Sequence, residues 1–201
     1  MILVTGASAS GKSAFAERLV TESGRRRRVY LATMASWDEE CRKRIERHKE
    51  LRAGKRFETI ECPTDIEGAV LPKGSVVLLE CMSNLAANEL FREDLVHNDV
   101  QAAGERICRG IERLMEAAGE LVVVTNEVFE DGERYSEETE SYRRLLGGLN
   151  IWLAERAQTA YEVVCGIALE AGRQNLTLDF LTSPPAVPIY NVERKTVPKG
   201  I

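Results

Sequence analysis

The sequence predicts an α/β fold in which a mostly parallel β-sheet is flanked by helices on both faces. Apolar runs of strand length alternate along the chain with longer helical patterns. Several of the runs are apolar at every position, which is typical of strands buried on both faces of a parallel sheet. The first run, residues 1–5, leads directly into a glycine-containing loop and then into a helical pattern over residues 14–20.

The loop reads G-x-x-x-x-G-K-S, the pattern of a phosphate-binding loop in its required strand–loop–helix context. Glycines at both ends allow the backbone N–H groups to converge on phosphate oxygens, and the helix N-terminus adds partial positive charge. Lys12 is placed to reach the β- and γ-phosphates and Ser13 to ligate Mg²⁺. The sequence therefore predicts a P-loop NTPase domain of the RecA-like kind. The predicted nucleotide ligands in the loop are Gly6, Ala7, Ser8, Ala9, Ser10, Gly11, Lys12 and Ser13.

Four arginines, Arg25 to Arg28, precede a predicted strand over residues 29–33. They could form a patch for phosphate or RNA, but a run this short beside a strand favours a solvated turn. A polar helix is predicted over residues 38–52, with acidic residues in its first turn. Its few apolar positions, Cys41 and Ile45, share one face with His48 and Arg52. From chemistry alone, a structural or surface histidine is the favoured interpretation of His48, and a functional one is the alternative.

The rest of the first 169 residues continues the alternation. Predicted strands cover residues 57–61, 75–80, 121–125 and 161–169, and predicted helices cover residues 64–70, 82–91, 100–118 and 136–159. Ligands of parallel sheets bind at the carboxyl ends of the strands. Thr33, Glu80, Asn126 and Glu127 follow such ends, so we expect them to share one site with the loop. Glu80 is a candidate ligand of Mg²⁺ or of its water; the alternative is an acid that faces solvent.

Composition restricts the classes of function. The chain has 201 residues and a net charge of −5, which argues against a general nucleic-acid binder. No apolar run is long enough for a bilayer, residues 1–5 leave no room for a signal peptide, and five cysteines without C-x-x-C pairing indicate reduced thiols in or near the core. We expect a cytoplasmic protein with a catalytic domain over residues 1–170 and a proline-bearing extension over residues 171–201.

With these residues identified, the chain resembles the bifunctional adenosylcobinamide kinase / adenosylcobinamide-phosphate guanylyltransferase family over about residues 1–168. The resemblance rests on the loop and on a series of strings in register after it. The strings are Tyr30-Leu31-Ala32-Thr33, Arg44-Ile45-Glu46-Arg47-His48-Lys49 with Arg52, Leu78-Leu79-Glu80-Cys81 with Asn88, and Val124-Thr125-Asn126-Glu127-Val128. The chain departs from the family pattern at Ala7 to Ala9, after Val128 and in the tail.

The resemblance implies phosphorylation of adenosylcobinamide by a nucleoside triphosphate, ATP or GTP, followed by transfer of GMP from GTP through a guanylylated histidine. His48 matches that histidine, Lys12 and Glu80 are the other implied catalytic residues, and Ser13 and Glu80 the implied metal ligands. The resemblance also implies a corrinoid substrate and a homo-oligomer. The implied GTP site adds Ala32, Thr33, Met34, Lys49, Glu50, Leu51, Arg52 and Glu61.

Two other functions remain open from the residues themselves. One is a P-loop kinase of a different hydroxyl, in which His48 is structural. The other is a nucleotide-dependent switch, although a nucleophile-type histidine on a polar helix is not a feature that a switch requires. A covalent GMP adduct would separate the bifunctional enzyme from both.

Overall fold

The computed structural model describes residues 1–35, 39, 46, 54–96, 98–127 and 135–171. The predicted helix over 38–52 is represented there only by Glu39 and Glu46, so His48 lies outside the described residues. The same holds for His97, for residues 128–134 and for the predicted extension from residue 172 onward.

A seven-stranded sheet organises the fold, with the strand order β3-β2-β4-β5-β1-β6-β7. All neighbours are parallel except β6 and β7, which are antiparallel. One strand, β5, lies between β1 and β4, the arrangement of RecA-like P-loop domains. The predicted fold class is confirmed. The strands are β1 (Ile2–Thr5), β2 (Arg28–Ala32), β3 (Phe57–Glu61), β4 (Val76–Glu80), β5 (Glu120–Val124), β6 (Thr159–Val164) and β7 (Ile167–Ala171).

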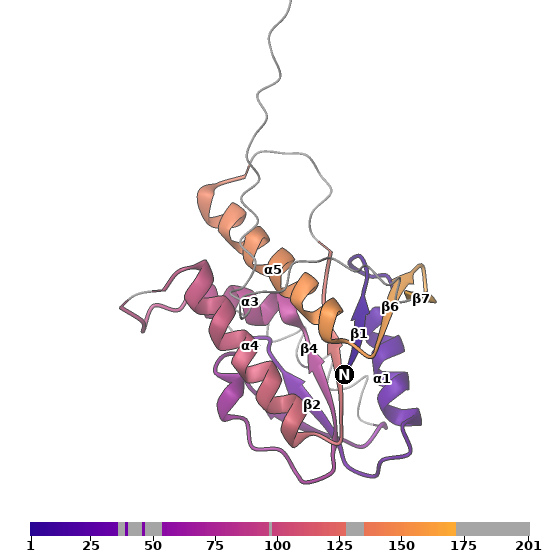
Figure 1. The fold of residues 1–201 in the computed structure, drawn as a ribbon. Coiled ribbons are helices and arrows are strands. Elements are labelled where there is room, and N and C mark those ends of the chain that lie inside the picture. The colour runs from indigo at the N-terminus through magenta and orange to yellow at the C-terminus, as the bar shows by residue number, and fades with distance from the viewer. Residues whose placement is uncertain (36–38, 40–45, 47–53, 97, 128–134, 172–201) are drawn as a thin grey trace, which may run out of the picture.

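Helices cover both faces of the sheet. The described helices are α1 (Lys12–Glu22), α3 (Met82–Leu90), α4 (Val100–Ala117), α5 (Glu137–Arg156) and the short 3₁₀ helix η1 (Ile66–Gly68). In Figure 1, α3, α4 and α5 lie on one side of the sheet and α1 lies on the other. None of these helices combines the length and the apolar character needed to cross a bilayer.

Alternation along the strands explains the two layers of core. Leu79 and Val123 pack with α3, α4 and α5, whereas their neighbours Leu78 and Val124 pack with α1. Successive strand residues point to opposite faces, so a strand between two helical layers must be apolar throughout. Each of these four side chains is fully buried. This is the pattern that predicted the parallel sheet.

The structure corrects four predictions, three of them at the end of the chain's described part. The single strand over 161–169 is wrong: β6 and β7 form a hairpin, because Cys165 (φ 49°) and Gly166 (φ 83°) make a tight turn with left-handed backbone. Cys165 is therefore exposed in a turn and is not a core thiol. Helix α5 ends at Arg156, not at Thr159, because Thr159 already pairs with Ile2. The short helix over 64–70 is a single 3₁₀ turn.

A glycine in α4 fixes how closely this helix approaches η1. A Cβ on Gly110 would lie 2.4 Å from Cγ1 of the buried Ile66 and 3.1 Å from the Glu67 backbone nitrogen. Such overpacking costs about 1–3 kcal/mol, and the gain in helix propensity offsets about 1 kcal/mol of it. Since a 2.4 Å contact with a buried side chain belongs in the upper part of that range, we expect Gly110→Ala to lower the free energy of unfolding by about 1–2 kcal/mol in chemical denaturation. Gly119→Ala is the control, since the three atoms nearest its Cβ all belong to the flexible end of Arg25. A Gly110→Ala protein as stable as the parent would contradict this packing.

Candidate functional site

The phosphate loop joins β1 to α1 and has the backbone that its sequence requires. Gly6 (φ 147°) and Gly11 (φ 94°) adopt positive φ, as does Ala9 (φ 59°) between them. Helix α1 begins at Lys12, so the N–H groups of its first turn have no acceptor within the helix and are free to bind an anion. The Ser10 hydroxyl is buried in the loop without a hydrogen-bond partner in the described part of the chain. The predicted loop thus has the form of an anion cradle.

The hairpin turn between β6 and β7 supports this loop from outside. The Gly166 N–H donates to the Ser10 carbonyl at 2.8 Å, and a Cβ on Gly6 would lie 2.5 Å from the Val163 carbonyl oxygen. Gly166 was not predicted as a site residue. In the sequence, Gly166 follows a cysteine inside an apolar run, and this local pattern does not predict a contact with Ser10.

Glu80 is held at the mouth of the loop by two side chains. The Ser13 hydroxyl donates to its Oε1, and the Tyr30 hydroxyl donates to its Oε2 at 3.0 Å. The predicted association of Glu80 with the loop is therefore present, and its side chain is half-buried. Tyr30 is 5% exposed and was not predicted, because an aromatic residue in a buried strand is typical of a core position. Tyr30 reaches Glu80 because Tyr30 pairs with Leu78, which lies two residues before Glu80 on β4.

Lys12 lies within the loop, 7% exposed, and donates to the Ala7 carbonyl at 2.9 Å. Burial lowers the pKa of its ammonium group by desolvation, and the negative charges of nearby Glu80 and Glu127 oppose that effect. Glu127 is fixed by the Thr5 hydroxyl, which donates to its Oε1 at 3.1 Å. A desolvated cation in this position has most to gain from phosphate oxygens.

The carboxyl ends of β2, β3 and β4 place three more predicted residues, Ala32, Thr33 and Glu61, beside Glu80. Ala32 pairs with Glu61 on one side and with Glu80 on the other. The Thr33 N–H donates to the Glu80 carbonyl at 3.1 Å, and the Thr33 hydroxyl donates to the Cys81 carbonyl at 2.9 Å. Met34, another predicted residue, follows Thr33 in the chain and is half-buried. The remaining predicted residues of this group, His48, Lys49, Glu50, Leu51 and Arg52, lie outside the described residues.

A polar network that sequence analysis did not predict continues from Cys81 along α3. The Asn126 side chain donates to the Ser83 hydroxyl at 2.6 Å, and Ser83 is 2.9 Å from the Cys81 sulfur. The Asn150 amide in turn donates to the Asn126 carbonyl at 3.1 Å. Asn126 was expected at this edge of the sheet from topology. The network gives the edge a second set of fixed polar groups beyond the loop.

The donor set at Ser13 and Glu80 fits a Mg²⁺ ion. A hydroxyl and a carboxylate oxygen are already in contact there, and both are hard oxygen ligands of the kind that Mg²⁺ prefers. When bound, the ion would neutralise charge on the phosphates of a nucleotide.

Tyr30 offers a test of this arrangement. We expect Tyr30→Phe to weaken Mg²⁺-dependent nucleotide binding by about tenfold, since a hydrogen bond to a charged group contributes about 1.5–3 kcal/mol. Titration of Mg²⁺ against binding of a fluorescent nucleotide measures it, and nucleotide binding without Mg²⁺ is expected to change little. Tyr161→Phe is the control, because that ring packs on Phe15. An unchanged Mg²⁺ titration in Tyr30→Phe would show that the phenol does not position Glu80.

The parallel sheet, the loop and the acid at the end of β4 define a P-loop nucleotide-binding enzyme. The family CobU, described as cobinamide kinase / cobinamide phosphate guanyltransferase, matches residues 2–171. This chain belongs to that family, which confirms the predicted family and enzyme class. A bifunctional adenosylcobalamin biosynthesis protein CobU of Escherichia coli is 33% identical over 85% of this chain and 98% of its own length. The corresponding CobU of Salmonella typhimurium is 32% identical with the same coverage, and a CobP of Pseudomonas aeruginosa is 30% identical over 83% of this chain and 94% of its own.

Solved structures with a similar fold are more distant in sequence. The flagellar accessory protein FlaH of Methanocaldococcus jannaschii is 15% identical over 80% of this chain and 69% of its own, with a TM-score of 0.39. The RadB recombinase is 19% identical over 80% of this chain and 72% of its own, with a TM-score of 0.38. We base the fold on the strand order and the loop.

Proposed function

We propose that this chain phosphorylates adenosylcobinamide and then guanylylates the product, using ATP or GTP for the first step and GTP for the second. The contact between Ser13 and Glu80 at the phosphate loop carries the proposal, in a chain whose family match spans residues 2–171. It supports triphosphate binding with the terminal phosphates at Lys12. The R-I-x-x-H-x-x-x-R string ending at Arg52 supports the second step.

In the first step, the oxygen of the aminopropanol hydroxyl attacks the γ-phosphorus. The bond from this phosphorus to the bridging oxygen breaks, the nucleoside diphosphate leaves and the hydroxyl proton passes to solvent. Lys12 and the loop amides stabilise the charge on the transferring group. Ser13 and Glu80 would hold Mg²⁺, with Tyr30 keeping the second Glu80 oxygen in place. The polar groups at Thr33, Ser83 and Asn126 are the described candidates for contacts with the acceptor.

In the second step, the neutral imidazole of His48 attacks the α-phosphorus of GTP and pyrophosphate leaves. A phosphate oxygen of adenosylcobinamide phosphate then displaces His48 from the guanylyl group, giving adenosylcobinamide-GDP and the free histidine. An imidazole suits this role because its ordinary pKa of about 6.5 leaves it largely neutral at pH 7. Ala32 to Met34, Lys49 to Arg52 and Glu61 would line the GTP site beside the loop residues.

The proposal includes a homo-oligomer, and a catalytic unit over residues 1–170 followed by an extension over 171–201. Incubation of the pure protein with adenosylcobinamide, Mg²⁺ and each nucleotide tests the chemistry. Chromatography is expected to show adenosylcobinamide phosphate with ATP or GTP, and adenosylcobinamide-GDP only with GTP. Formation of adenosylcobinamide phosphate alone under all conditions would mean that the protein is a kinase without the guanylyl transfer step. Absence of both products, with GTP still bound, would support the switch.

A further inference from the structure

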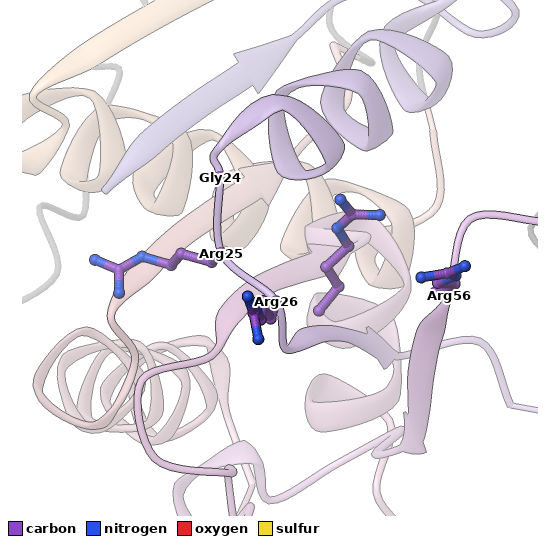
Figure 2. Close-up of a pocket in the computed structure, with 5 residues that line it drawn as sticks. Gly24, Arg25, Arg26 and Arg56 are labelled. Atoms are coloured by element: carbon purple, nitrogen blue, oxygen red, sulfur yellow. The ribbon is translucent and has the colours of Figure 1, made fainter.

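A basic site lies at the amino-terminal ends of strands β2 and β3, at the opposite end of the parallel sheet from the phosphate loop. A pocket of about 410 Å³ is lined by Gly24, Arg25, Arg26, Arg28 and Arg56. Figure 2 shows Arg25 and Arg26 on the segment that leaves α1 and Arg56 where the chain enters β3. These positions precede β2 and β3, whereas the phosphate loop follows the end of β1. Since the strands are parallel and rise about 3.3 Å per residue, five-residue strands separate the two edges by about 15 Å.

Arg28 is fixed in place by neutral groups. It donates to the Lys55 carbonyl at 3.0 Å and to the Thr21 carbonyl at 2.9 Å, so it ties the start of β3 to the end of α1. Its Nε is buried with no partner within the described ranges. A guanidinium bonded to carbonyls is immobilised but keeps its charge, and no carboxylate among the described residues forms an ion pair with Arg28.

The other charges around the pocket divide into paired and unpaired groups. Lys55 is paired with Glu17, and Arg25 is bonded to the Gly119 carbonyl at 2.9 Å and lies 4.0 Å from a Glu120 oxygen. Arg26 and Arg56 are exposed and make no ion pair or hydrogen bond with any residue in the described part of the chain. Three guanidinium groups, those of Arg26, Arg28 and Arg56, therefore line one pocket, and none of them is paired with a carboxylate of the described residues. Like charges gathered around one pocket favour the binding of an anion.

We propose that this pocket binds a compact polyphosphate, with a diphosphate group as the part recognised. Guanidinium groups match phosphate oxygens in planar, bidentate fashion, and the pocket volume lies within the range of small-ligand sites. A long polyanion such as RNA is disfavoured, since the chain as a whole carries a net charge of −5. The proposal extends the phosphate interpretation of Arg25 to Arg28, while the exposure of Arg26 and Arg27 agrees with the solvated turn.

The test must separate this pocket from the phosphate loop, which also binds phosphates. We would titrate inorganic pyrophosphate by calorimetry into full-length Lys12→Ala, in which phosphate binding at the loop is weakened by loss of its cation, and into the same chain with Arg26→Gln and Arg56→Gln added. Binding is expected to persist in Lys12→Ala and to weaken about tenfold or more in the triple variant, since each lost charge-assisted bond is a substantial part of the affinity. The two arginines are exposed, so thermal melting should confirm an intact fold.

A charge-matched control carries Lys12→Ala with Arg113→Gln and Arg144→Gln, two exposed arginines on α4 and α5, and it should bind pyrophosphate as Lys12→Ala does. ADP titrated in parallel distinguishes the sources of the diphosphate: tighter binding than pyrophosphate, again lost in the triple variant, identifies a nucleotide as the ligand. No pyrophosphate binding to Lys12→Ala, or equal binding by all variants, overturns the proposal. Binding of a single-stranded RNA oligomer without binding of pyrophosphate also overturns it.

Discussion

Replacing Gly6 by alanine is expected to weaken nucleotide binding severely and to destabilise the fold. Gly6 adopts a φ of 147°, which an L side chain adopts only with strain of about 1–3 kcal/mol. Its Cβ would lie 2.5 Å from the Val163 carbonyl oxygen and 2.8 Å from Ser10 Oγ. The first of these atoms belongs to the backbone of β6, which is paired with β1 over Ile2 to Thr5 and with β7 on its other side, so it cannot move away alone.

The loop must therefore move, and its N–H groups lose the geometry that binds phosphate. We expect the dissociation constant for Mg²⁺·GTP to rise by at least about 100-fold, because the loop supplies most of the phosphate contacts. Calorimetric titration measures the affinity and thermal melting measures the stability. Gly74→Ala is the matched control: Gly74 has a φ of 74° with no atom within 4 Å of the added Cβ, so strain is added without a clash. Binding by Gly6→Ala within about threefold of the parent would show that the loop is not the triphosphate site.

Much of this site could be predicted because it depends on backbone topology. The loop motif specifies its own strand and helix, and parallel strands bring Thr33, Glu80 and Asn126 to the same edge whatever the details of packing. Ser13 and Glu80 met as expected, although 67 residues separate them.

Tyr30 and Gly166 could not be predicted, since each acts through a register that no local pattern contains. The Tyr30 hydroxyl reaches Glu80 only because β2 and β4 pair with Tyr30 opposite Leu78. Gly166 contacts Ser10 only because β6 pairs with β1 and turns back beyond the loop. The hairpin itself was missed because its strands are apolar on both sides of a two-residue turn, which periodicity does not distinguish from one longer strand.

Replacement of His48 by alanine is expected to separate the two proposed activities. In the parent chain, GTP labelled at the α-phosphate should leave label on the denatured protein, acid-labile and stable to alkali, as a phosphoramidate is. In His48→Ala this label should be absent, and guanylyl transfer should fall by a factor on the order of 10³ or more, because the covalent intermediate cannot form. Formation of adenosylcobinamide phosphate should persist, since Lys12, Ser13 and Glu80 remain.

His97→Ala is the internal control, because His48 and His97 are the two histidines of the chain. It should retain the adduct and both products. A label that survives in His48→Ala and disappears in His97→Ala would move the nucleophile to His97. Loss of the phosphorylated product together with the adduct would instead mean that His48 supports the common triphosphate site and is not a nucleophile. Under the proposed function, in which His48 matches the family's guanylylated histidine, we expect loss of the guanylyl step alone.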